Sequence, residues 1–338
     1  MARSLAGAVL LLLGPASAKQ APLSVFGHQA PDTDTVTAAL VYAWELNERK
    51  VPAKAFRLGD LNPETAFVLK AVGVEAPPLF GGAINAPVPA GEPVAVVDTN
   101  NPAELPEGIS KAQVHSIVDH HKLAGLTNAE PLEVDMRPLC SATSILFARA
   151  KAANLTPPKH IAGLMLAGLL SDSLGFRSPT TTEVDKTHAA ELGKLAGLDV
   201  TKFADDMLEA KAQVDHYSAK ELLKMDSKIF TLGGKKLRVS VLETTKPAVP
   251  LAKKDELVKT MKALVAEEKL DDVILFVVDV IEEAATFVSG SASATALVEK
   301  AWRVVVDRAS GTVVLPGVLS RKKQMIPKLE AALTTAEL

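Results

Sequence analysis

The 338-residue chain has 48% hydrophobic and 23% charged residues and a formal net charge of −3. This composition is ordinary for a globular protein, and the length accommodates two domains, each with its own core. The near-neutral charge argues against a general polyanion-binding surface, and 4% aromatic residues leave few platforms for stacking single-stranded nucleic acid. We therefore expect no nucleic-acid partner. A phosphate site would have to be a local pocket of positive charge, or be built by metal ions.

Residues 1–18 have the pattern of a cleavable signal peptide. A basic start at Arg3 precedes an apolar run from Leu5 to Leu13, and Ala16-Ser17-Ala18 gives the small-x-small cleavage pattern. The run is far shorter than the roughly 20 residues that span a bilayer, and no other segment predicts a membrane span. We predict export, to the periplasm if the source is bacterial, with a cytoplasmic location as the alternative. The single cysteine, Cys140, forms no internal disulfide and is expected to be a buried structural thiol.

From Leu23 onward, short β-rich runs alternate with longer helical runs, which is typical of a parallel α/β sheet. Strands are expected at residues 23–26, 55–58, 94–97 and 114–118, and helices at about 35–50, from 62 onward, at 161–174 and after a capping box at 182–185. Residues 210–216 are polar and lack an apolar period. They are predicted to link an N-terminal domain (19–209) to a C-terminal domain (217–338).

The second half of the chain has a different pattern. Gly233-Gly234 between two β-rich runs predicts a hairpin. Further elements are expected as a helix over about 253–269, a strand over 273–280, a second hairpin over 302–306 and 312–315, and a last helix opened by Ser320 and ending near 333. The predicted fold class is α/β with two domains: an N-terminal parallel-sheet domain and a smaller C-terminal domain with a mixed sheet.

Acidic and imidazole side chains follow three of the predicted strands and end one predicted helix. In chain order they are His28, Asp32, Asp34, Asp98, Asp119, His120, His121 and Asp172. The carboxyl ends of parallel strands meet at one edge of a sheet, and such donors bind divalent cations. Taken alone, each motif is also compatible with a turn, a helix cap or a solvated loop. Their repetition at successive strand ends favours a metal site.

The spacing within these motifs adds detail. Asp32 and Asp34 lie two apart in a stretch that Pro31 keeps extended, so that they can face two neighbouring cations. In an extended backbone the side chains of His120 and His121 point to opposite sides, so that one can bind metal while the other faces substrate. Asp119 is expected to hold an imidazole in one tautomer. Asp172 would either cap its helix or bind a cation.

A basic cluster, Ser320-Arg321-Lys322-Lys323-Gln324, lies near the end of the chain. Three adjacent positive charges at a helix N-terminus are unfavourable against the helix dipole, and a bound anion would offset that cost. The alternative is an ordinary solvated helix start. Metal ligands and clustered cations in one chain together indicate hydrolysis of a phosphoanhydride.

The motifs Gly-His-Gln-x-Pro-Asp-Thr-Asp, Asp-His-His, Ser-Asp-Ser and Ser-Arg-Lys-Lys-Gln, in this order, resemble those of the DHH phosphoesterase superfamily. Within it the chain resembles the manganese-dependent (family II) inorganic pyrophosphatases from Leu23 to the last helix. The resemblance implies a first metal held by His28, Asp32 and Asp98. It implies a second metal held by Asp34, Asp98, His120 and Asp172, with Asp98 bridging. Substrate phosphate would be held by His121, Lys228, Arg321 and Lys322, which with Asp98 form the expected catalytic set.

The activity implied is hydrolysis of inorganic pyrophosphate to two phosphates by a hydroxide shared between two Mn²⁺ ions. The active site would lie in the cleft between the domains, and the C-terminal domain would close over the substrate. Co²⁺ is a possible substitute, Mg²⁺ is expected with the substrate, and a homodimer is expected. The alternatives are an exopolyphosphatase of the same superfamily, a DHH-type oligonucleotide phosphodiesterase, and a non-catalytic metal-binding protein. One departure is visible: Thr99-Asn100-Asn101 stands where many members have His-Asn-Glu.

Overall fold

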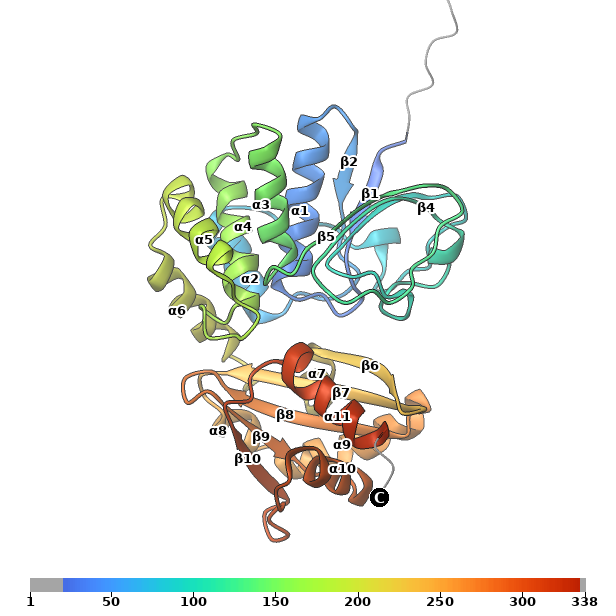
Figure 1. The fold of residues 1–338 in the computed structure, drawn as a ribbon, viewed down its shortest axis with the longest axis vertical. Helices are drawn as coiled ribbons and strands as arrows, with labels where there is room; N and C mark the ends of the chain where they lie inside the picture. The colour runs from blue at the N-terminus through green and yellow to red at the C-terminus, as the bar shows by residue number, and fades with distance from the viewer. Residues whose placement is uncertain (1–20, 335–338) are drawn as a thin grey trace, which may run out of the picture.

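The computed structural model describes residues 21–334, which form two α/β domains, each built on its own five-stranded sheet (Figure 1). The predicted two-domain fold class is therefore confirmed. The predicted signal peptide, residues 1–18, lies outside the described residues. Within residues 21–334, no helix combines the length and the apolar character needed to cross a membrane.

The first sheet is entirely parallel, and its strands have the order β2-β1-β3-β4-β5. The strands are β1 (Leu23–Phe26), β2 (Ala53–Ala55), β3 (Pro93–Val97), β4 (Gln113–Asp119) and β5 (Glu133–Met136). The three central strands, β1, β3 and β4, are the ones with acidic or imidazole residues within two positions after their ends. Because neighbouring parallel strands end at the same edge, these residues are brought together.

Helices cover one face of this sheet, and loops with short 3₁₀ turns cover the other. The helices are α1 (Thr33–Glu48), α2 (Pro63–Val72), α3 (Ala142–Ala152), α4 (Lys159–Asp172), α5 (Glu183–Ala196) and α6 (Val200–Lys211). The 3₁₀ turns are Phe80–Gly82, Pro102–Glu104 and Ile109–Lys111. Helix α4 packs against α1, α3 and α5 and is buried from Ile161 to Ser171, which explains why its sequence is apolar on every side.

The second sheet is mixed, with the order β10-β9-β8-β7-β6, and only β7 and β8 pair in parallel. Its strands are β6 (Ser227–Leu232), β7 (Lys235–Thr244), β8 (Asp272–Asp279), β9 (Ala284–Val288) and β10 (Thr312–Pro316). Helices α7 (Ala219–Met225) and α9 (Lys254–Glu268) cover one face, and α10 (Ala292–Trp302) and α11 (Ile326–Thr334) cover the other. A short helix α8 (Ala248–Leu251) precedes α9, and a π-helical turn (Arg321–Met325) precedes α11.

The second predicted hairpin is wrong. Residues 292–302 form helix α10, whose N-cap Ser291 accepts a hydrogen bond from the amide of Ala294. Strand β10 instead pairs antiparallel with β9, a strand that the sequence pattern did not predict, and only a single bridge joins Asp307 to Thr312. The predicted linker, residues 210–216, overlaps the segment between the ends of α6 and α7, and its boundaries stay a prediction.

Candidate metal and phosphate site

The loop after β1 brings three candidate ligands to the edge of the first sheet. Gly27 lies so close to β3 that a Cβ atom there would be 2.8 Å from the carbonyl oxygen of Val97. His28 is buried, and Asp32 is the N-cap of α1, where it accepts a hydrogen bond from the amide of Thr35 at 2.9 Å. Because the cap uses only Oδ1 of Asp32, its Oδ2 can face Nε2 of His28, 3.3 Å away.

Asp34, in the first turn of α1, is fully buried and is held by the N-terminus of α3. Its Oδ2 accepts a hydrogen bond from the amide of Ala142 at 2.7 Å. Its Oδ1 accepts two more from Thr143, one from the amide at 3.1 Å and one from the hydroxyl at 2.8 Å. Helix termini attract carboxylates in this way. Asp34 therefore has a structural role in addition to its predicted role as a ligand.

Asp98, directly after β3, is at the centre of the cluster. Its backbone has a φ of 56°, in the left-handed region that residues other than glycine seldom adopt. Its carboxylate accepts a hydrogen bond from the hydroxyl of Thr35 at 2.5 Å. It also lies 3.1 Å from Nε2 of His120 and 3.4 Å from Nε2 of His28. Among the residues that the structure describes, Asp98 is the carboxylate that lies within 3.5 Å of both His28 and His120.

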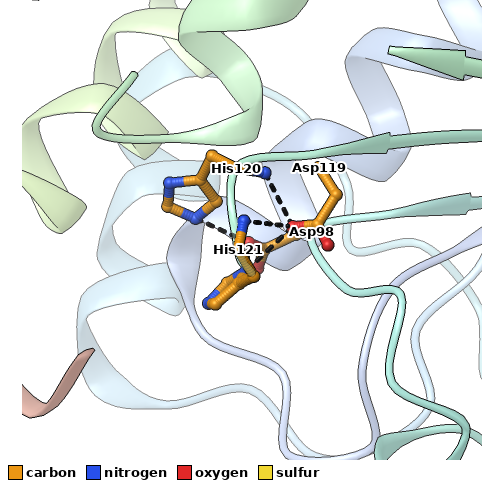
Figure 2. Close-up of side chains that lie close together, drawn as sticks. All are labelled: Asp98, Asp119, His120 and His121. Atoms are coloured by element: carbon orange, nitrogen blue, oxygen red, sulfur yellow. Dashed lines mark hydrogen bonds and ion pairs between the residues drawn. The ribbon is translucent and has the colours of Figure 1, made fainter. Parts of the chain in front are cut away.

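Figure 2 shows how the end of β4 presents its two histidines around Asp119. Oδ1 of Asp119 accepts hydrogen bonds from the amides of His120 and His121, and lies 2.8 Å from Nδ1 of His121. This contact fits a His121 tautomer that donates from Nδ1 and leaves Nε2 free, as predicted for Asp119. Asn100 donates a hydrogen bond to the other oxygen of Asp119 at 2.5 Å. Asn100 belongs to the segment Thr99-Asn100-Asn101, which differs from the motif of many family members, and it helps to fix the carboxylate that holds His121.

The prediction that His120 and His121 point to opposite sides is wrong. Their ring centroids are 4.4 Å apart with planes at 75°, and both rings line the same cavity. The extended strand ends at Asp119, so the alternation of strand side chains no longer applies one residue later. His120 nevertheless faces the acidic residues, with Nε2 3.3 Å from Asp172, which lies on the last turn of α4.

The predicted ligands form two overlapping clusters that share Asp98. In each cluster, one candidate ligand atom per residue lies within 4.8 Å of every other. The first cluster consists of His28, Asp32 and Asp98, and the second of Asp34, Asp98, His120 and Asp172. A further grouping joins Asp119 to Asp98, His120 and His121; in it, Asp119 fixes the position of His121, whose Nδ1 lies 2.8 Å from its Oδ1.

The residues fit divalent metal ions by two observations. Both ring nitrogens of His28 are buried without a hydrogen-bond partner, and Nε2 only faces carboxylates at 3.3 and 3.4 Å. Burial and the neighbouring Asp98 raise the pKa of Asp34 to about 7, and burial and Asp34 raise that of Asp172. Against the effect of burial, Asp32 and Asp98 raise the pKa of His28 to about 10. The cluster thus attracts positive charge, and its mixed imidazole and carboxylate donors suit Mn²⁺.

Cations of the second domain face these clusters across a cavity of about 440 Å³ lined by both domains. Nζ of Lys322 lies 3.1 Å from the carbonyl oxygen of His120. The guanidinium of Arg321 pairs with Asp226 at 2.6 Å, and Lys228 on β6 pairs with Glu104 at 3.1 Å. Lys323, the third cation of the basic cluster, instead donates to the carbonyl oxygen of Pro179 at 3.1 Å. Burial and Lys228 lower the pKa of His121 to about 4, so this imidazole is neutral at neutral pH.

Three further residues of the site were not predicted from the sequence. Asn100 holds Asp119, Glu104 holds Lys228, and Lys211 at the end of α6 contacts Glu64 and Glu243. Glu104 and Lys211 have no motif signal, because their partners are far away in the sequence. His188, which had no predicted role, is buried against Ser144 and Phe147.

The comparisons with known proteins cover both domains. The family model described as the DHH family, N-terminal domain, matches residues 22–169, and that of the DHHA2 domain matches residues 205–332. A Deinococcus radiodurans protein named a probable manganese-dependent inorganic pyrophosphatase is 40% identical over 315 residues, covering 91% of this chain and 98% of the relative. The manganese-dependent inorganic pyrophosphatase of Bacillus subtilis is 37% identical, with coverage of 91% and 98%.

A solved structure from Methanococcus jannaschii, assigned to the family II inorganic pyrophosphatases, superposes with a TM-score of 0.82 at 30% identity. It covers 93% of this chain and 100% of the solved chain. The order of the motifs, the two clusters that share Asp98 and these relatives over nearly the whole chain agree. The chain belongs to the manganese-dependent inorganic pyrophosphatases of the DHH family.

Proposed function

We propose that this protein hydrolyses inorganic pyrophosphate to two phosphates in the cavity between its domains, with two Mn²⁺ ions bound. Two carboxylate–imidazole clusters that share Asp98 carry the proposal. Lys228, Arg321 and Lys322 face these clusters across one cavity. In this proposal His28, Asp32 and Asp98 hold one ion, and Asp34, Asp98, His120 and Asp172 hold the other. The bound ions supply Lewis acidity and a nucleophile derived from water.

The side chains of the chain then have distinct roles. Lys228, Arg321 and Lys322 bind phosphate oxygens and offset the negative charge that develops during the reaction. His121, fixed by Asp119 and neutral at neutral pH, presents its Nε2 to the substrate as a hydrogen-bonding group. The basic residues belong to the second domain and the metal ligands to the first. Closure of the cleft is therefore required to assemble both sets and to exclude bulk water around the phosphates.

Family membership supports three further parts of the proposal. Co²⁺ is expected to replace Mn²⁺ at the same donors, and Mg²⁺ is expected to enter with pyrophosphate. The active form is proposed to be a homodimer. Export by residues 1–18 is likewise proposed from the sequence pattern alone.

The test is phosphate release by the full chain with Mn²⁺ and Mg²⁺, with pyrophosphate, tripolyphosphate and long-chain polyphosphate offered in parallel. The proposal expects a strong preference for pyrophosphate, loss of activity after dialysis against a chelator, and recovery with Mn²⁺. Faster turnover of long chains would assign the protein to the exopolyphosphatases instead. Inactivity with every metal would support the non-catalytic alternative.

A further inference from the structure

An ion pair between the domains lines the 440 Å³ cavity in which the substrate is proposed to bind, here called the substrate cavity. Nζ of Lys228 on β6 lies 3.1 Å from Oε2 of Glu104, and both side chains are largely buried, at 9% and 14% exposure. Glu104 is fixed by its own loop, because the hydroxyl of Thr99 donates to Oε2 at 3.0 Å and the side-chain amide of Asn101 donates to Oε1 at 3.3 Å. The carboxylate therefore has one position, which the first domain sets.

This ion pair lies between two cavities. Glu104 and Lys228 line the 440 Å³ cavity that holds the basic residues and the histidine pair. They also line a second cavity of about 660 Å³, which lies between the domains and is bordered by Tyr217 and Arg238. A substrate longer than pyrophosphate that extended from the first cavity toward the second would have to pass this pair.

The second cavity adds no net positive charge that would favour phosphate. Lys224 and Arg238, which line it, share Glu268 as their partner, and the carboxylates of Asp60 and Glu221 line the same cavity. Although burial opposes it, Lys228 together with His28 lowers the pKa of Glu104 to about 2, so its carboxylate is ionised at neutral pH. An additional phosphate at this place would meet a fixed negative charge in a partly dehydrated site, where repulsion is strong.

We propose that Glu104 restricts the substrate to two phosphates: its fixed carboxylate closes the end of the substrate cavity and repels a third phosphate. The inference rests on the proposed function, because it assumes that pyrophosphate binds beside Lys228. It adds a specificity determinant to the site, and Glu104 touches the substrate-binding Lys228 while contacting none of the proposed metal ligands.

The experiment compares kcat/KM for tripolyphosphate with kcat/KM for pyrophosphate in the wild-type protein and in Glu104→Gln, Glu104→Asp and Glu107→Gln. Glutamine keeps the shape of the side chain and removes the charge, so the ratio of the two values is expected to rise about tenfold. Aspartate retains the charge and should keep the wild-type ratio. Glu107→Gln is the matched control, because it removes an exposed charge from the same loop.

Two results would overturn the inference. In the first, Glu104→Gln lowers both values of kcat/KM by the same factor, as expected of a residue that only ties the domains together. In the second, the ratio in Glu104→Gln equals that of the Glu107→Gln control. The wild-type measurement distinguishes failure of this inference from failure of the proposed function. If the proposed function is wrong, the wild-type protein will not hydrolyse pyrophosphate, whatever the variants do.

Discussion

Asp98 has an unusual backbone conformation and a central position among the candidate metal ligands. It adopts a left-handed backbone conformation, accepts a short hydrogen bond from Thr35, and is the only residue shared by both clusters of candidate ligands. Strained backbone at a site is tolerated when surrounding contacts fix it, and the orientation it gives is then available for function. The side chain of Asp98 thereby faces His28 and His120 at the same time.

Replacing Asp98 with asparagine should remove binding at both metal sites, because a neutral amide cannot offset the charge of two cations. We expect kcat to fall by about a thousandfold or more and the Mn²⁺ content of the purified protein to fall with it. Elemental analysis and pyrophosphate assays measure the two effects. Asp60→Asn, which neutralises a carboxylate that is 80% exposed, is the control. A wild-type kcat in Asp98→Asn would contradict the shared role.

At the scale of elements, helix α4 reaches the metal site through a glycine. A Cβ atom on Gly168 would lie 2.6 Å from Oδ1 of Asp34 and from the hydroxyl of Thr143, and 2.7 Å from the hydroxyl of Thr37. The helix can therefore approach α1 and α3 only because this position has no side chain. Asp34 is positioned by the same close packing.

Gly168→Ala should displace Asp34 and weaken the second proposed metal site. Alanine favours a helix interior by roughly 0.5–1 kcal/mol over glycine, but the clash at Asp34 outweighs this gain. We expect the affinity for Mn²⁺, measured by calorimetry, to fall about tenfold. Gly163→Ala is a matched control on the same helix, because its Cβ would meet the apolar Val72 instead. Equal affinities in the two variants would show that the packing of α4 does not position Asp34.

The elements show what the sequence can and cannot predict. The strands before His28, Asp98 and Asp119 were predicted because each is a short apolar run that ends in polar residues, and parallel pairing then brings those ends together. Strand β9 was missed because residues 280–283, which connect it to its antiparallel neighbour β8, contain no Gly, Pro, Asn or Asp to signal a turn. The pairing of Glu104 with Lys228 spans 124 positions and leaves no local pattern.

At the scale of the whole molecule, Lys211 joins the two domains near the end of α6. Its ammonium lies 2.8 Å from Glu243 on β7 of the second domain and 3.3 Å from Glu64 on α2 of the first. Glu64 in turn accepts hydrogen bonds from Thr33 and Ser171, which are the neighbours of proposed metal ligands. The contact between the domains is thus connected to the metal site by a short chain of hydrogen bonds.

Lys211→Met should leave two carboxylates facing each other without the cation between them. Removing the cation from this buried group of charges is expected to lower the free energy of unfolding by about 3–5 kcal/mol. The KM for pyrophosphate should rise, because the two domains then close less readily. Denaturant titration and pyrophosphate kinetics measure these effects. Lys202→Met is the control, because Lys202 lies on the same helix with its side chain 74% exposed. Identical stabilities in the two variants would argue against this role.

The single cysteine of the chain has a practical consequence for studying the motion of the domains. Cys140 is 1% exposed, its thiol lies 3.8 Å from the carbonyl oxygen of Leu169, and burial together with Asp185 raises its pKa well above the usual range. A protonated, enclosed thiol reacts slowly with maleimides. One introduced cysteine on each domain can therefore carry a pair of fluorophores without removal of the native residue. Energy transfer between the dyes would then follow opening and closing of the cleft during turnover.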